Sequence, residues 1–187
     1  NTFSEDGTIA LSGIYFNGEG NLLGYATSKG GSDWKEFYIH DLTTGKDLED
    51  YLKWIKFSDM SWAGDGFYYS RFSEPKGGGE LDDVNENSEV YYHKLGTNQN
   101  EDRLIYSDPE NPRISNYIST TDDENFLILY RTKGTSGTAL YITQISEGEH
   151  KFISVIDNYE DVHGISGNIG GTFYLHTNYK AKNWRLV

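Results

Sequence analysis

Short apolar segments alternate with turn signals along the whole chain. In one example, residues 126–130 are all apolar or aromatic, and the four residues before them are Asp, Asp, Glu and Asn. Apolar and aromatic runs of this length, bounded by turn residues, predict β-strands. Residues 47–56 are expected to hold a further short strand, although residues 48–55 can also form one helical turn. The other predicted strands span residues 10–16, 22–27, 37–42, 60–63, 67–72, 89–95, 103–106, 116–119, 126–131, 139–145, 152–157, 172–177 and 184–187.

The strand pattern repeats in units of four. The second strand of each unit begins at Leu22, Phe67, Phe126 and Thr172, which are 45, 59 and 46 residues apart. Repetition at roughly 40 to 50 residues with four strands per unit is typical of β-propeller blades. We therefore predict an all-β fold of four-stranded antiparallel blades, with a β-sandwich as the alternative. The blades are expected at about residues 8–56, 57–108, 112–157 and, incompletely, 158–187.

The long middle spacing contains an insertion at residues 73–88. This segment has three consecutive glycines, five carboxylates and few apolar residues. Such a composition does not offset the entropy lost on ordering, so we expect a mobile loop that proteases cut early.

Composition excludes several classes of protein. Apolar residues make up 36% of the 187-residue chain and aromatic residues 15%, which is enough for a core and argues against disorder. The net charge of −13 repels nucleic acid phosphates and anionic lipids, so neither nucleic acid nor membrane is an expected partner. No apolar run is long enough to span a bilayer. Both the cytoplasm and the periplasm stay open as locations.

The sequence has no complete catalytic or cofactor motif. There is no cysteine, and the nearest approach to a G-x-S-x-G nucleophile elbow is GISG at residues 164–167. Asp82–Asp83 and Asp122–Asp123 lack the spacing of an EF-hand loop, and turn chemistry accounts for the second pair. We expect no cofactor, no metal site and structural roles for the five histidines, which are His40, His93, His150, His163 and His176.

Five segments together resemble the propeller domain of one peptidase family. They are FSEDGTIAL at residues 3–11, GSDW at 31–34, IKFSDMSW at 55–62, VYYHKLGT at 90–97 followed by Glu101 and Asp102, and TN at 177–178 with NWRL at 183–186. In this order, spread over the whole chain, they resemble the prolyl oligopeptidase (prolyl endopeptidase) family.

The resemblance implies a fold and a function. It implies about four blades of a seven-bladed propeller that caps an α/β-hydrolase catalytic domain in the same parent chain. The parent is expected to be a serine-type endopeptidase that cleaves short peptides after proline, with its Ser-Asp-His triad in the hydrolase domain. This chain, which we expect to be cut at both ends, should therefore be inactive alone, because acyl transfer needs nucleophile, base and oxyanion hole together.

The resemblance also implies substrate-facing residues. Phe57 matches an aromatic residue lining the pocket for the side chain two places before the proline, and Phe72 matches another aromatic position. Arg131 lies near an arginine that faces the central cavity, although Thr132 is the alternative match. Ser115 stands where the family often has an apolar pocket residue, and loop 73–88 resembles a loop that gates substrate entry. The alternative for Phe57 is an ordinary core residue, and for the loop a passive linker.

Other functions and assemblies stay open. A stand-alone protein-interaction propeller would need enough blades to close, and a carbohydrate-binding propeller would need stacking residues such as Trp34 and Trp62. Four blades leave two apolar end faces bare, so we expect a homodimer through the cut edges or closure into a distorted four-bladed ring.

Overall fold

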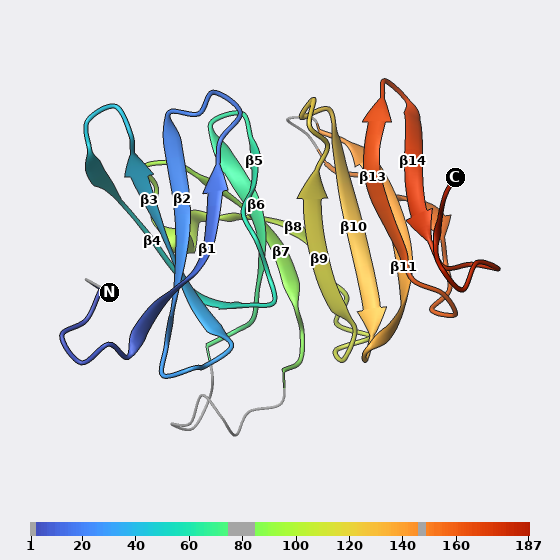
Figure 1. The fold of residues 1–187 in the computed structure, drawn as a ribbon, viewed down its shortest axis with the longest axis horizontal. Coiled ribbons are helices and arrows are strands. Elements are labelled where there is room, and N and C mark those ends of the chain that lie inside the picture. Colours follow the sequence, from blue (N-terminus) through green and yellow to red (C-terminus); the bar gives the residue numbers. More distant parts are fainter. Residues whose placement is uncertain (1–2, 75–84, 146–148) are drawn as a thin grey trace.

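The computed structural model describes residues 3–74, 85–145 and 149–187, and within them the chain forms four antiparallel sheets (Figure 1). The first sheet contains β1 (Ile9–Phe16), β2 (Leu22–Lys29), β3 (Trp34–Asp41) and β4 (Lys46–Lys56). The second contains β5 (Ser61–Ala63), β6 (Gly66–Arg71), β7 (Glu89–Lys94) and β8 (Arg103–Tyr106). The third contains β9 (Ser115–Thr120), β10 (Phe126–Lys133), β11 (Ser136–Gln144) and β12 (Ile153–Ile156). The fourth contains β13 (His163–Ile169), β14 (Thr172–Thr177) and β15 (Arg185–Leu186).

Within each sheet the strands follow one another in chain order, so every sheet is a simple up-and-down meander. Consecutive sheets pack face to face, through β4 and β6, then β6 and β9, then β11 and β13. The first and fourth sheets lie at opposite ends of the resulting row, as Figure 1 shows. The row is therefore open, and the expected closure into a four-bladed ring is not what the chain adopts.

Three apolar clusters fill the three junctions between sheets. Phe37, Leu52 and Phe67 centre the first, Tyr68, Leu127 and Leu129 the second, and Ile128, Leu140 and Ile142 the third. The alternation of side chains along β10 explains how one strand serves two clusters, because successive residues point to opposite faces. The continuous apolar run at residues 126–130 is thus buried from both sides.

The segment before Phe57 is a strand and not a helical turn. β4 extends over 11 residues, pairs with β3 and buries Asp50 and Leu52 on one face. Its register shifts between the pairs Lys35–Ile55 and Phe37–Leu52, which places a bulge beside Trp54. An element the sequence pattern did not predict, the 3₁₀ helix η1 (Gln99–Glu101), follows β7 and begins with a capping box at Asn98.

Candidate functional site

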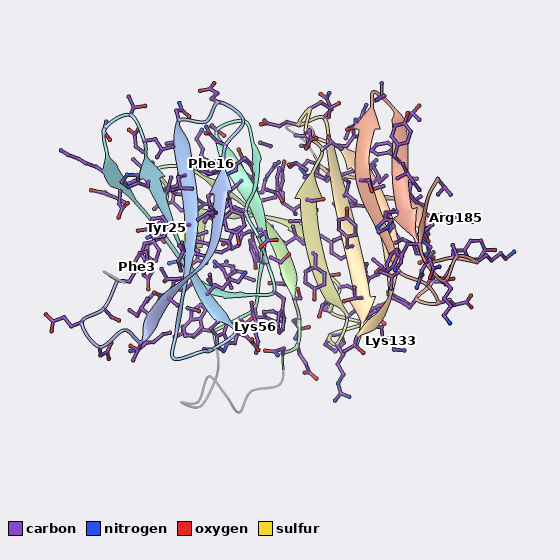
Figure 2. All side chains as sticks on the ribbon, in the orientation of Figure 1. Phe3, Phe16, Tyr25, Lys56, Lys133 and Arg185 are labelled. Atoms are coloured by element: carbon purple, nitrogen blue, oxygen red, sulfur yellow. The ribbon has the colours of Figure 1, made fainter. Side chains whose placement is uncertain are left out.

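The residues expected to face substrate all lie at one end of the sheets, which we call the lower rim. It is the edge where β4, β6 and β10 end and β9 begins. Figure 2 labels Lys56 and Lys133, the last residues of β4 and β10, along this edge. Phe57 follows Lys56, Phe72 follows β6, Ser115 opens β9 and Arg131 lies near the end of β10.

Phe57 is held outward by a strained backbone. Both Trp54 and Phe57 have positive φ, at 60° and 53°, a conformation that costs a residue other than glycine about 1 kcal/mol or more. The carbonyl of Trp54 accepts a hydrogen bond of 3.0 Å from the Phe72 amide, which ties the end of β4 to the end of β6. The Phe57 side chain remains 47% exposed, so it is not the ordinary core aromatic that was the alternative.

A cation lies beside the exposed ring. The Lys56 ammonium is 5.4 Å from the centroid of the Phe57 ring and 5.2 Å from that of Trp34. It is also 3.8 Å from the carboxylate of Asp33. Ammonium groups at such distances are attracted to aromatic faces, so Lys56 restrains the Phe57 ring from one side.

Phe72 has a different role from Phe57. Its side chain is only 7% exposed and packs edge-on against Trp34, with ring centroids 6.0 Å apart. Trp34 packs edge-on against Trp54 as well. Phe72 thus supports Trp34, whose ring shares the Lys56 ammonium with Phe57, and its own ring is buried.

Arg131 is buried at the second junction between sheets, and its guanidinium is paired. Its Nε donates to the side-chain oxygen of Asn116 at 3.2 Å, and a terminal nitrogen bonds the carboxylate of Asp108. The rings of Tyr106 and Tyr141 lie 5.5 and 6.0 Å from the guanidinium carbon. Arg131 itself is 8% exposed, so as folded it links the third sheet to the second.

Tyr141, one of the two rings beside the Arg131 guanidinium, bonds a carboxylate of its own. Burial, together with a hydrogen bond to the Asp157 carboxylate, raises the pKa of Tyr141 to about 12. The phenol is therefore a neutral donor throughout the physiological range.

Ser115 and Arg131 share the lower rim but not a face of the third sheet. Ser115 pairs with Thr132, whereas Arg131 pairs with Asn116. Paired residues point to the same face of a sheet and their neighbours to the other, so Ser115 and Thr132 face away from Arg131. Thr132, the alternative match for the cavity-facing arginine position, therefore lies on the Ser115 face.

The inserted loop is anchored at both of its described ends. Residues 75–84, the middle of segment 73–88, lie outside the described residues. On the far side, the Glu86 carboxylate pairs with Arg113 at 3.2 Å and the Asn87 amide donates to the Pro112 carbonyl. Because Phe72 is tied to the first sheet and these residues to the β8–β9 connection, the two ends of the segment attach at different junctions.

Sequence reasoning missed the partners that position the candidate residues. Lys56 lies against Phe57 and also against Trp34, and Asp108 pairs with Arg131, although no pattern in the sequence linked these residues. The sequence signal for one of these contacts is that Lys56 directly precedes Phe57 in the chain. Trp62, considered for sugar stacking, is buried at 8% exposure and donates its indole N–H to the Tyr15 carbonyl at 3.0 Å.

Within residues 3–74, 85–145 and 149–187, no cluster of three or more histidine or acidic side chains is arranged to hold a metal ion. In the same part of the chain, no helix has the length and apolar character needed to cross a membrane.

Four consecutive meander sheets, each packed face to face on the next, define a β-propeller. Residues 1–187 match the family described as prolyl oligopeptidase, N-terminal beta-propeller domain. The chain therefore belongs to this family, whose propeller is the non-catalytic part of a serine peptidase.

Individual relatives agree with this assignment. The chain is 39% identical to a prolyl endopeptidase of Elizabethkingia miricola and 40% identical to one of Elizabethkingia meningoseptica, over 190 residues in each case. It also superimposes, over its whole length, on prolyl oligopeptidase B from Galerina marginata with a TM-score of 0.88 and 27% sequence identity. The alignments take in all of this chain but only 26% of each endopeptidase and 28% of the Galerina protein, so the chain spans about a quarter of its relatives.

Proposed function

We propose that this chain works as the propeller of a longer serine-type endopeptidase that cleaves proline-containing peptides, and that its lower rim helps line the substrate cavity. The α/β-hydrolase domain of the same parent chain is its partner in this role. The observation that carries the proposal is Phe57, a large aromatic side chain that the fold holds at the rim at an energetic cost and leaves half exposed. Strained, exposed side chains gather at functional sites, where the surrounding structure stabilises them.

The test uses the parent enzyme and the substitution Phe57→Ala. Peptides with a large apolar side chain two places before the proline should lose affinity, seen as a rise in KM of about tenfold, which is the usual worth of one aromatic contact of about 1.4 kcal/mol. Peptides with glycine at that place should be unaffected. The matched control is Leu104→Ala, because Leu104 is similarly exposed (49%) but lies on the outer strand β8. Equal effects on both peptides, or equal effects of both variants, would contradict the proposal.

For the chain alone we expect no hydrolysis of a chromogenic proline peptide, because the sequence has no nucleophile elbow. Turnover that persists after removal of contaminating proteases would refute this expectation.

A homodimer of the isolated chain is the second proposal, and the bare face of the first sheet favours it. Leu11, Ile14 and Phe16 on β1 are 52, 56 and 57% exposed. Figure 2 shows Phe16 and Tyr25 on this sheet. Burying such side chains is worth about 25 cal/mol per Å². Light scattering over a concentration series should show association that Ile14→Asp abolishes, and a strictly monomeric chain would refute the proposal.

A further inference from the structure

A buried histidine at the first junction joins carboxylates from two sheets. His93 on β7 lies 2.7 Å through Nδ1 from the Asp102 carboxylate and 2.9 Å through Nε2 from that of Asp50. Asp102 lies between η1 and β8, directly before the last strand of the second sheet, whereas Asp50 lies on β4 of the first. The side chains of all three residues are at most 1% exposed, so water does not screen them.

Both ring nitrogens face acceptors, and this determines the protonation of the cluster. A neutral imidazole has one donor and one acceptor, so one of its nitrogens would confront a carboxylate oxygen without a proton between them. An imidazolium donates to both carboxylates. Satisfying both carboxylates therefore requires an imidazolium. This state holds one proton more than a neutral imidazole between two ionised aspartates.

The remaining bonds of the carboxylates are made within the same junction. The Asp102 carboxylate accepts from the Tyr69 hydroxyl at 2.5 Å, and that of Asp50 accepts from the Gly96 amide at 2.7 Å. The Phe67 ring covers the imidazole, with centroids 5.2 Å apart. The positive charge of Arg71 also acts at this place, through its effect on Tyr69.

A second contact at the same junction involves no titratable group. The side-chain amide of Gln99 in η1 accepts from the Lys53 amide at 3.1 Å and donates to the Lys53 carbonyl at 3.0 Å. It thus occupies the hydrogen-bonding edge of β4 as a neighbouring strand would. Gln99 thus gives this junction a contact that does not change with pH, alongside the histidine cluster, which does.

We propose that Asp50, His93 and Asp102 form a proton-dependent clamp between the first two sheets, in which one imidazolium shared by a carboxylate from each sheet holds β4, and with it Phe57, in place. Alkaline loss of that proton leaves two buried carboxylates facing a neutral ring and loosens the junction. The inference concerns the folded chain itself, and it does not depend on the peptidase role of the rim.

The sign of the pH effect follows from the surroundings of His93. Burial alone lowers the pKa of His93, but the hydrogen bonds to Asp102 and Asp50 and their charges outweigh burial and raise it to about 9. The group thus binds its proton more tightly in the folded than in the unfolded chain. Its contribution to stability is complete below the unfolded value of 6.5 and is lost as pH rises through about 9.

The test is chemical unfolding of this chain from about pH 6 to about pH 9.5, a range that ends below the usual pKa of tyrosine. The unfolding equilibrium constant should rise on the order of a hundredfold across that range. His93→Gln should abolish most of this rise. His40→Gln is the matched control, since His40 also bonds an aspartate, Asp47, at 2.7 Å, but its side chain is 31% exposed. A rise as steep in His93→Gln as in the unmodified chain would overturn the proposal.

Two readouts remain if His93→Gln fails to fold. Nitrogen NMR of the unmodified chain at neutral pH should show both ring nitrogens of His93 protonated, and Asp50→Asn should move its titration to lower pH. The Gly96 amide, corrected for base catalysis, should lose hydrogen-exchange protection near pH 9 while the amide of Leu129 in the third sheet keeps it. A neutral His93 at pH 7, or protection of Gly96 that survives above pH 10, would contradict the clamp.

Discussion

One methyl group at Gly137 tests how tightly the third sheet is packed against the connection to the fourth. Gly137, the second residue of β11, has a φ of +78°, and a Cβ there would lie 1.8 Å from the carbonyl oxygen of Tyr159 and 2.8 Å from its Cα. The obstacle is backbone, which cannot rotate away as a side chain can. Gly134, in the turn just before, has a φ of +75°, and a Cβ there would meet nothing within 4 Å.

The two positions separate two costs. Gly137→Ala and Gly134→Ala both place alanine in the left-handed region, at about 1 kcal/mol each. Only Gly137→Ala also forces apart closely packed atoms, which costs a further 1 to 3 kcal/mol or so. We expect a loss of about 3 kcal/mol in the free energy of unfolding for Gly137→Ala and of about 1 kcal/mol for Gly134→Ala.

Urea unfolding followed by tryptophan fluorescence measures both values. In Gly137→Ala the Tyr159 backbone must move, so the neighbouring hydrogen bond of 2.8 Å from the Thr138 amide to the Asp161 carbonyl should lose hydrogen-exchange protection. Equal destabilisation by the two substitutions would show that backbone conformation alone requires glycine here, and that the close approach to Tyr159 does not occur.

Two paired substitutions test the core and the charges in the same way. Phe37→Ala, in the first junction, should cost about 3 to 5 kcal/mol in urea unfolding. Tyr38→Ala, on the other face of the same strand, removes a half-buried ring that stacks on Tyr25 and Tyr51 and should cost about 1 kcal/mol; equal losses would mean that the two faces are equally covered. Asp108→Asn leaves the buried guanidinium of Arg131 without its anion and should lower the free energy of unfolding by about 3 kcal/mol. Arg113→Ala removes an exposed ion pair with Glu86 and should change the free energy of unfolding by no more than about 0.5 kcal/mol. The reverse order would contradict the burial of Arg131.

Strand positions followed from the sequence because local pattern and tertiary burial agree there. β8 was predicted at its observed bounds, 103–106, and β14 at 172–177. In the third unit, the apolar run at 126–130 predicted a strand buried on both faces, and β10 packs between two clusters. Glycine, asparagine and aspartate form the turns between these strands. The repeat length of the strand units and the positions of the turn residues therefore both indicated propeller blades.

β4 was ambiguous for a physical reason. Its bulge depends on left-handed conformations at Trp54 and Phe57, two aromatic residues that local preference would keep out of that region. Tertiary contacts favour this backbone, among them the packing of Trp54 against Trp34 and the hydrogen bond from Phe72. Sequence pattern does not contain contacts of that kind.

The histidine cluster was also beyond local reasoning. His93 was expected to be structural, which its burial agrees with, but its partner Asp50 lies 43 residues away on another sheet. Charged residues in a chain of net charge −13 are ordinarily solvated, so nothing in the pattern singled out Asp50 or Asp102.

Phe57 and Arg131 differ in what each needs in order to meet a peptide at the lower rim. The Phe57 ring is already half exposed and restrained by Lys56, so a ligand gains contact area without breaking a bond. Arg131 must first leave Asp108 and Asn116. A peptide carbonyl is a neutral acceptor. If Arg131 bonded a carbonyl in place of Asp108, the charge-assisted bond would be lost and the buried Asp108 carboxylate would be left without a cation. We therefore expect a peptide bound at this rim to gain its binding energy from Phe57, whereas Arg131 is expected to hold the second and third sheets together.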